Sequence, residues 1–160
     1  MKIKNSHLIL MALVITSQVL AQGTPKLELT IVDTKINLTP DEKSGKTKIV
    51  YKPGDDIHYT IMAQNAGDGV MMTPIVTDPI PAGVIYIPLS AKGKDAVVTF
   101  SINSGITYQP WPPTYIVKDA NGKDVVKNAP PEMTTHIRWE LQKPLAPSEK
   151  KILEFDVKVK

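Results

Sequence analysis

The fold class is decided by residues 51–67, which read Tyr-Lys-Pro-Gly-Asp-Asp-Ile-His-Tyr-Thr-Ile-Met-Ala-Gln-Asn-Ala-Gly. Pro53 and Gly54 favour a turn, because proline presets φ and glycine adopts a positive φ without strain, and Asp55 can accept hydrogen bonds from neighbouring amides. From residue 57 to residue 64 apolar side chains alternate with more polar ones, which is typical of a strand with one buried face. The stretch therefore predicts a turn followed by a core strand.

Asn65 and Gly67 come directly after this strand and favour a turn with a left-handed residue. No helix-period apolar stripe survives after Ala21, because prolines and glycines interrupt every such pattern. Alternating stretches recur instead, and in the first of them Leu27, Leu29 and Ile31 form one apolar face. We expect strands at residues 27–32, 47–51, 57–64, 70–78, 84–87, 97–102, 136–141 and 153–160, a charged loop at 41–46, and a hairpin at 115–126 with a two-residue type I′ turn at Asn121-Gly122.

Short strands with turns between them and no intervening helices predict an all-β fold. The expected architecture is an immunoglobulin-like antiparallel β-sandwich of about seven to nine strands, formed by one domain over residues 22–160. A chain of this length buries enough surface to fold without metal or disulfide support.

Residues 1–21 predict a cleaved signal peptide. A lysine-bearing start precedes an apolar run over residues 8–15, and Val19-Leu20-Ala21 provides small or apolar residues for cleavage. The apolar run is shorter than the roughly 20 residues that a membrane-spanning helix needs. We therefore expect export to the periplasm, the outer envelope surface or the extracellular medium, with no membrane span after signal removal.

Charge and composition exclude several classes of function. The chain has 160 residues, 19 Lys and Arg, 16 Asp and Glu, and no cysteine. Cleavage after Ala21 removes Lys2 and Lys4, so the exported domain is near neutral and lacks the clustered positive charge that nucleic acid binding needs. Without cysteine the chain has no disulfide, no thiolate metal site and no cysteine nucleophile. We expect no cofactor.

Residues 51–67, together with a second block at residues 77–86, resemble the conserved-repeat family once called domain of unknown function eleven. Later blocks at 100–105, 137–139 and 145–147 are also similar, so the resemblance covers essentially the whole exported chain. It implies an immunoglobulin-like sandwich found in exported bacterial envelope and surface proteins, often in tandem copies, and it implies no catalytic residues. This chain departs from the tandem pattern because it carries one copy. The residues of the two blocks that we interpret as turn formers are Pro53, Gly54, Asp55, Asn65, Gly67, Asp78, Pro81 and Gly83.

Tyr108, Trp111 and Tyr115 are interleaved with prolines and form a candidate contact surface for a partner or a glycan. Rigid prolines can hold aromatic rings outward, where the rings would stack on a sugar or anchor a partner peptide. The alternative is that Trp111 folds down and caps one end of the sandwich. The loop at residues 108–115 makes carbohydrate binding the alternative function.

His58 and His136 are the histidines of the exported chain, and both fall on the predicted outer faces of strands. A hydrolase or zinc site would need them to converge with carboxylates, and the sequence shows no His-x-x-x-His or nucleophile-elbow spacing. We interpret them as surface or sheet-pairing residues and predict no catalytic and no metal site.

Two calcium hypotheses and one covalent hypothesis are weaker. Residues 119–124 place three oxygen-bearing side chains around a glycine, but no glutamate follows at the twelfth position of such a loop, so a hairpin turn explains them better. Asp55-Asp56 with Asp78 would be a second acidic cluster, although these residues also suit turns. A lysine cross-linked to Asn65 is the covalent hypothesis.

The function we expect from these patterns is a non-enzymatic structural or protein-interaction module of the bacterial envelope or surface. Its partner would be another envelope or surface protein, docked on an edge strand, since edge strands expose unpaired backbone groups. Lys158 and Lys160 would protect one such edge from self-association.

Overall fold

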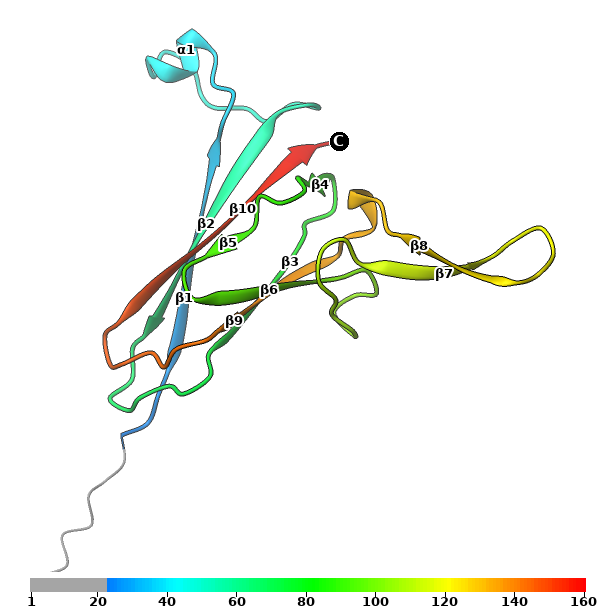
Figure 1. The fold of residues 1–160 in the computed structure, drawn as a ribbon. Helices are drawn as coiled ribbons and strands as arrows, with labels where there is room; N and C mark the ends of the chain where they lie inside the picture. The colour runs from blue at the N-terminus through cyan, green and yellow to red at the C-terminus, as the bar shows by residue number, and fades with distance from the viewer. Residues whose placement is uncertain (1–22) are drawn as a thin grey trace, which may run out of the picture.

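The computed structural model describes residues 23–160, and the predicted signal peptide lies outside them. These residues form an all-β fold of antiparallel sheets, which confirms the predicted fold class (Figure 1). The described residues form ten strands against the expected seven to nine, and the two-residue strand β5 was not among the predicted stretches. The elements are β1 (Leu27–Lys35), α1 (Pro40–Lys43), β2 (Asp56–Asn65), β3 (Ile75–Pro79), β4 (Val84–Tyr86), β5 (Lys92–Gly93), β6 (Ala96–Ser101), β7 (Thr114–Lys118), β8 (Asp124–Asn128), η1 (Pro131–Met133), β9 (His136–Leu141) and β10 (Lys150–Val159).

Two sheets pack face to face around one core. The first has the order β1-β2-β10-β4, with β5 also paired to β10, and the second has the order β3-β9-β6. Trp139 of the second sheet contacts Phe155 of the first, with 5.9 Å between ring centroids. Each large side chain that is fully buried here contributes about 1.5–3 kcal/mol to folding. The buried apolar residues of the core are Ile57, Ile61, Ala63, Val76, Tyr86, Phe100, Ile137, Trp139, Leu141, Leu153, Phe155 and Val157.

In the central strands, the residues that are apolar in the alternating sequence pattern are the residues that are buried. In β9, Ile137, Trp139 and Leu141 are buried while His136, Arg138 and Glu140 are half-buried on the other face. A period of two places successive side chains on opposite faces of a sheet, so one pattern defines both the core face and the outer face.

The strand expected at residues 47–51 does not form, and the charged loop next to it contains the short helix α1. The helix begins because Thr39 accepts a hydrogen bond from the backbone of Glu42, whose side chain bonds back to Thr39. At Val50, the backbone N–H and C=O bond to the side chains of Glu42 and Lys35, so side chains replace the neighbouring strand. Alternation of apolar and polar residues could not predict that side chains bond to this backbone in place of a strand.

The strand expected at residues 70–78 is shorter, since regular pairing begins only at Ile75. Met71 instead exchanges backbone hydrogen bonds of 3.0 and 2.8 Å with Leu145. Pro74, which lies between Met71 and Ile75 in the sequence, has no N–H to donate and interrupts the hydrogen-bond ladder. The predicted extended segment is therefore divided between a loop bridge and β3.

The hairpin β7–β8 stands away from the two main sheets (Figure 1). Its position was predicted correctly, but the two-residue turn was wrong: Gly122 has φ +77° and Asn121 does not share a positive φ, which a type I′ turn would require. The carboxylate of Asp119 accepts hydrogen bonds from the backbone of Asn121 and Lys123, which favours a longer turn. At mid-hairpin the paired side chains of Ile116 and Val126 are exposed.

Candidate functional site

Trp111 does not present its ring to solvent as a sugar platform. The indole packs edge-on against Tyr86 and Phe100, with 5.2 Å between ring centroids in both pairs. The side chain is half-buried against the core, as the capping alternative predicts. An indole enclosed by two aromatic rings stabilises the end of the sandwich, so the packing favours the cap over the glycan contact.

The other two aromatic residues of the loop lie in different places. Tyr108 covers the guanidinium of Arg138, with 3.5 Å from the Cζ atom to the ring centroid. Tyr115 belongs to β7 and pairs with Lys127 across the hairpin. Tyr108, Trp111 and Tyr115 are therefore divided among a sheet face, the core and the hairpin.

The two histidines lie on different sheets. His58, in β2, contacts Asp156 with 2.6 Å between Nδ1 and Oδ1, and Glu154 lies 3.7 Å from its Nε2 atom. His136, in β9, has Thr135 Oγ1 3.2 Å from its Nδ1 atom. Neither histidine in the described range contacts a serine together with a carboxylate, so no nucleophilic triad is assembled between residues 23 and 160.

The acidic residues singled out for calcium are engaged elsewhere. Asp119 accepts turn hydrogen bonds, Asp124 pairs with Lys118, and Asp56 pairs with Lys158. Asp78 lies in β3 on the second sheet, where burial raises the pKa of its carboxyl. Within residues 23–160 no three His, Asp or Glu side chains gather as metal ligands.

The side-chain amide of Asn65 links separate backbone segments through hydrogen bonds. Its buried side-chain amide donates to the carbonyls of Gly69 and Leu145, at 2.7 and 2.9 Å, and its Oδ1 atom accepts from the backbone of Lys26 and Gly67. The amide thus joins the start of β1, the turn after β2 and the loop before β10. Both amide hydrogens are engaged by backbone carbonyls.

Pro53, Gly54, Pro81 and Gly83 lie at turns that lead into strands, and the two glycines have φ values of +88° and +94°. A side chain at either position would be strained, because L residues rarely adopt this region. Their role is therefore conformational.

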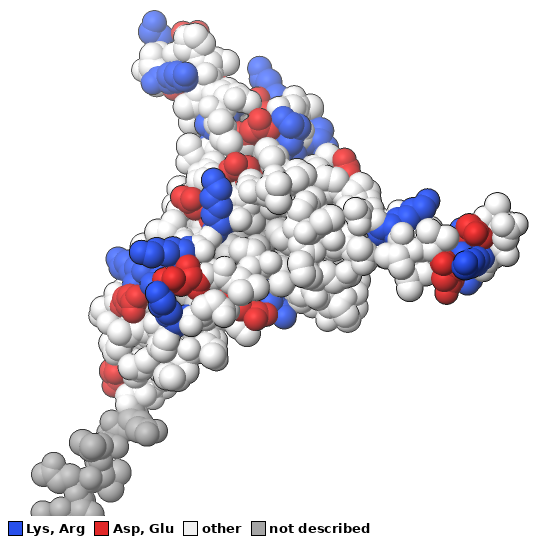
Figure 2. Space-filling model, viewed as in Figure 1, with Lys and Arg blue, Asp and Glu red and all other residues white. Residues whose placement is uncertain are grey.

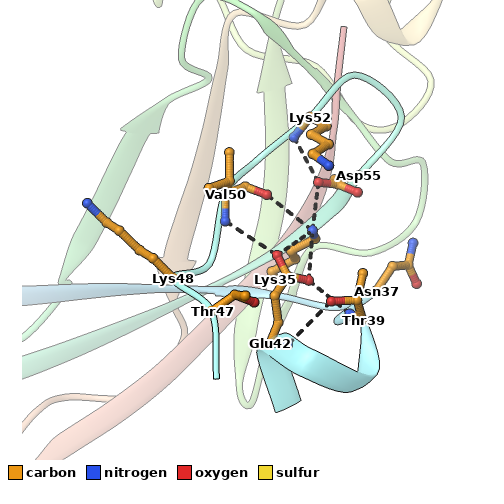
Figure 3. A pocket seen from close by; sticks show the side chains of 9 residues that line it. All are labelled: Lys35, Asn37, Thr39, Glu42, Thr47, Lys48, Val50, Lys52 and Asp55. Atoms are coloured by element: carbon orange, nitrogen blue, oxygen red, sulfur yellow. Dashed lines mark hydrogen bonds and ion pairs between the residues drawn. The ribbon is translucent and has the colours of Figure 1, made fainter. Parts of the chain in front are cut away.

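Lys35 forms a buried ion-pair cluster that the sequence patterns did not reveal (Figure 3). It is the last residue of β1 and only 3% exposed. Its Nζ atom lies 3.0 Å from Asp55, 3.1 and 3.2 Å from the two carboxylate oxygens of Glu42, and 3.2 Å from the carbonyl of Val50. A shallow cavity of about 370 Å³ adjoins the cluster.

The electrostatics of the cluster favour the ionised form of both carboxylates. The backbone N–H of Thr39 is the main cause that lowers the pKa of Glu42 to about 2, with Lys35 contributing further. The backbone N–H of Lys52, and then Lys35, lower the pKa of Asp55, while hydrogen bonding to Asp55 is the main cause that raises the pKa of Lys35. Two carboxylates and one ammonium give the cluster a net charge of −1, and its ion pairs fasten residues 36–55 to the sheet.

We predict that the stability of the protein falls in acid through Glu42. A carboxyl whose pKa drops from 4.5 unfolded to about 2 folded stabilises the native state above pH 4.5, and this contribution is lost as the pH falls towards 2. The urea midpoint, measured from neutral pH to pH 2, should fall less steeply in Glu42→Gln than in the unmodified protein. Asp41→Asn is the matched control on α1, and an acid profile as flat in this control as in Glu42→Gln would contradict the prediction.

β1 is an edge strand whose core-side face is only partly covered. Leu29 and Ile31 lie opposite Ala63 and Ile61 on that face, yet they are 43% and 49% exposed. The second sheet ends at β3, which spans five residues. The apolar face expected for residues 27–32 exists, but the fold leaves it open.

Among residues 23–160, no strand pairs with the backbone of β1 on its outer side. Lys26 accepts a hydrogen bond from Ala66, and Ile36 donates one to Asp56, so the even-numbered residues between them face β2. Because backbone groups alternate along an antiparallel strand, the N–H and C=O groups of Leu29, Ile31 and their odd-numbered neighbours face the free edge. Free backbone groups and open apolar side chains therefore occur on the same residues.

Charge does not mark a site on the face shown in Figure 2. Lysines and acidic residues lie side by side near the ends of the molecule and on the hairpin, and a broad neutral area separates them. Such a surface has no single-sign field to attract a polyanion.

The chain matches no protein-family model, no curated protein and no solved structure. Among residues 23–160 no helix is long and apolar enough to cross a membrane.

Proposed function

We propose that this protein is an exported, non-enzymatic module of the bacterial envelope or surface, and that it binds a partner protein by accepting a strand at the free edge of β1. The observation that supports this function best is the nine-residue edge strand with Leu29 and Ile31 open on its core side. Export rests on the signal peptide predicted for residues 1–21, and the immunoglobulin-like assignment rests on the resemblance to the conserved-repeat family.

The chemistry of the partner follows from the edge. Long edge strands are usually shortened, covered or interrupted by proline, and β1 contains no proline. A segment added beside it would bond to the odd-numbered residues of β1 and carry apolar side chains at alternate positions, which would cover Leu29 and Ile31. We therefore infer an extended, alternately apolar segment of an envelope protein as the ligand.

Carbohydrate binding through the whole loop at residues 108–115 has less support. Trp111, the residue best suited to stack on a sugar, packs on Tyr86 and Phe100 instead. Hydrolysis by His58 or His136 has less support still, since the two rings belong to different sheets. The strand-addition proposal needs neither feature.

The test is crosslinking in cells of the native organism with Ile31→Lys as the variant. A lysine there would place a charge in the closed interface and should remove the partner from the crosslinked complex. Val97→Lys is the matched control. The side chain of Val97 is 47% exposed, a fraction similar to that of Ile31, but it lies on the outer face of the second sheet.

The proposal expects one crosslinked envelope protein with the unmodified chain and with Val97→Lys, and its loss with Ile31→Lys at an unchanged melting temperature. Equal recovery with both variants would contradict strand addition at β1. A chain recovered without any envelope protein would contradict the interaction function itself.

A further inference from the structure

Arg138 is the one arginine of the sequence, and it occupies the middle of the second sheet. It lies in β9, the central strand, where Thr77 of β3 and Thr99 of β6 are its direct neighbours across the sheet. Directly opposite residues share a face, so the three side chains form one patch on the outer side of the sandwich.

Tyr108 fixes the position of the guanidinium. The ring lies 3.5 Å from Arg138 Cζ and covers one side of the planar group, a stacking arrangement that restricts the cation without neutralising it. The loop behind the ring is closely packed, because a Cβ atom added at Gly105 would come within 3.0 Å of the Tyr108 hydroxyl and 3.5 Å of the His136 ring. Arg138 is thus held in place before any ligand arrives.

The guanidinium has no anionic partner among residues 23–160. No carboxylate of this range lies within ion-pair distance, and the group donates no hydrogen bond to the protein there. Its Nε atom is buried without a partner, as is the Oγ1 atom of neighbouring Thr99. Lys35, in contrast, is a buried cation whose Nζ atom is surrounded by three oxygen-bearing groups.

The residues around Arg138 favour a polar ligand. Along β9 the neighbours of Arg138 on the same face are His136 and Glu140, so the four nearest positions, including the two threonines, are all polar. Both edges of β9 are paired, which leaves no backbone groups for an added strand. Protein partners anchor through apolar or aromatic side chains in pockets, which these positions do not provide.

We propose that Arg138 binds the carboxylate of an acidic sugar of the hexuronate class. A guanidinium presents parallel N–H groups that match the two oxygens of a carboxylate. The hydroxyl of the exposed Thr77 and the side chains of His136 and Glu140 can then exchange hydrogen bonds with the sugar hydroxyls. Glu140 makes no ion pair with Arg138, so it does not compete with the ligand carboxylate for the guanidinium N–H groups.

Titration with sodium glucuronate, followed by NMR of the purified protein, tests this site. Saturable shifts are expected for the Arg138 side-chain Nε–H and for the backbone amides of Thr77 and Thr99, and glucose, the neutral counterpart, should not reproduce them. Arg138→Lys keeps the charge but loses the paired donors, so affinity should fall about tenfold. Lys127→Gln removes one positive charge on the hairpin and is the control for a general charge effect.

The decisive measurement uses the unmodified protein and therefore does not depend on whether the variants fold. Absence of saturable shifts with glucuronate at millimolar concentration would overturn the proposal, and so would equal shifts with glucose. An acidic peptide that binds at Arg138 where glucuronate does not would overturn the sugar assignment. Ile31→Lys should leave the titration unchanged, which separates this site from the proposed strand addition at β1.

Discussion

Asn65→Ala should lower the free energy of unfolding by about 3–5 kcal/mol, because it leaves buried backbone groups without their partners. The amide of Asn65 is fully buried and makes four hydrogen bonds to backbone groups from three separate segments of the sequence. Water cannot replace it at that depth. Thermal unfolding followed by circular dichroism should show a melting temperature lower by roughly 10–20 °C.

Asn103→Ala is the matched control for this prediction. Asn103 also joins its neighbours through side-chain hydrogen bonds, to Ser101 and Thr107, but it is exposed. Solvent can take over those bonds, so we expect a loss within about 0.5–1 kcal/mol. Similar losses for the two variants would show that burial of the Asn65 amide is not what stabilises the fold.

Trp111→Ala is expected to destabilise the protein by about 2–4 kcal/mol, since it removes an indole that is half-buried between two core rings. A cavity would open beside Tyr86 and Phe100 at the end of the sandwich. Urea unfolding monitored by circular dichroism measures the change.

Tyr115→Ala is the comparison for Trp111, because Tyr115 comes from the same aromatic-proline loop but belongs to the hairpin. We expect it to cost at most about 1 kcal/mol, as for most substitutions away from a core. If Trp111→Ala left stability unchanged and abolished glycan retention, the capping role would be wrong and the sugar platform would be restored.

The central strands were predictable because their local pattern and their final environment agree. In β2, β9 and β10 apolar residues alternate with mostly polar ones. Each of these strands has a paired strand on both sides, and its core face packs against the opposite sheet. Under those conditions a period of two is sufficient to identify the buried side chains.

The edge of the sandwich was not predictable in the same way. Leu29 and Ile31 show the same alternation as the core strands, yet they are exposed, because exposure depends on which other parts of the fold pack over β1 and no residue in β1 encodes that. The cluster around Lys35 depends on partners from α1 and from the turn before β2. A lysine in an alternating strand is normally read as solvent-facing, so only the tertiary structure reveals its burial.

The guanidinium of Arg138 is an intermediate case. Alternation in β9 places it on the outer face, and this is where it lies. Its cover by Tyr108, thirty residues earlier in the sequence, could not be inferred, because it depends on how the loop after β6 folds back over the sheet.

The order of strands in the first sheet also determines how the protein would respond to tension. β2 runs antiparallel to both β1 and β10, so β1 and β10 point in the same direction (Figure 1). The first residue of β1 and the last residue of β10 therefore lie at opposite ends of the sheet. Pulling on residues 23 and 160 would therefore slide the strands past one another. The hydrogen bonds of such a sheet lie across the strands and would be sheared together instead of opening one at a time. This arrangement is suited to a mechanically resistant element.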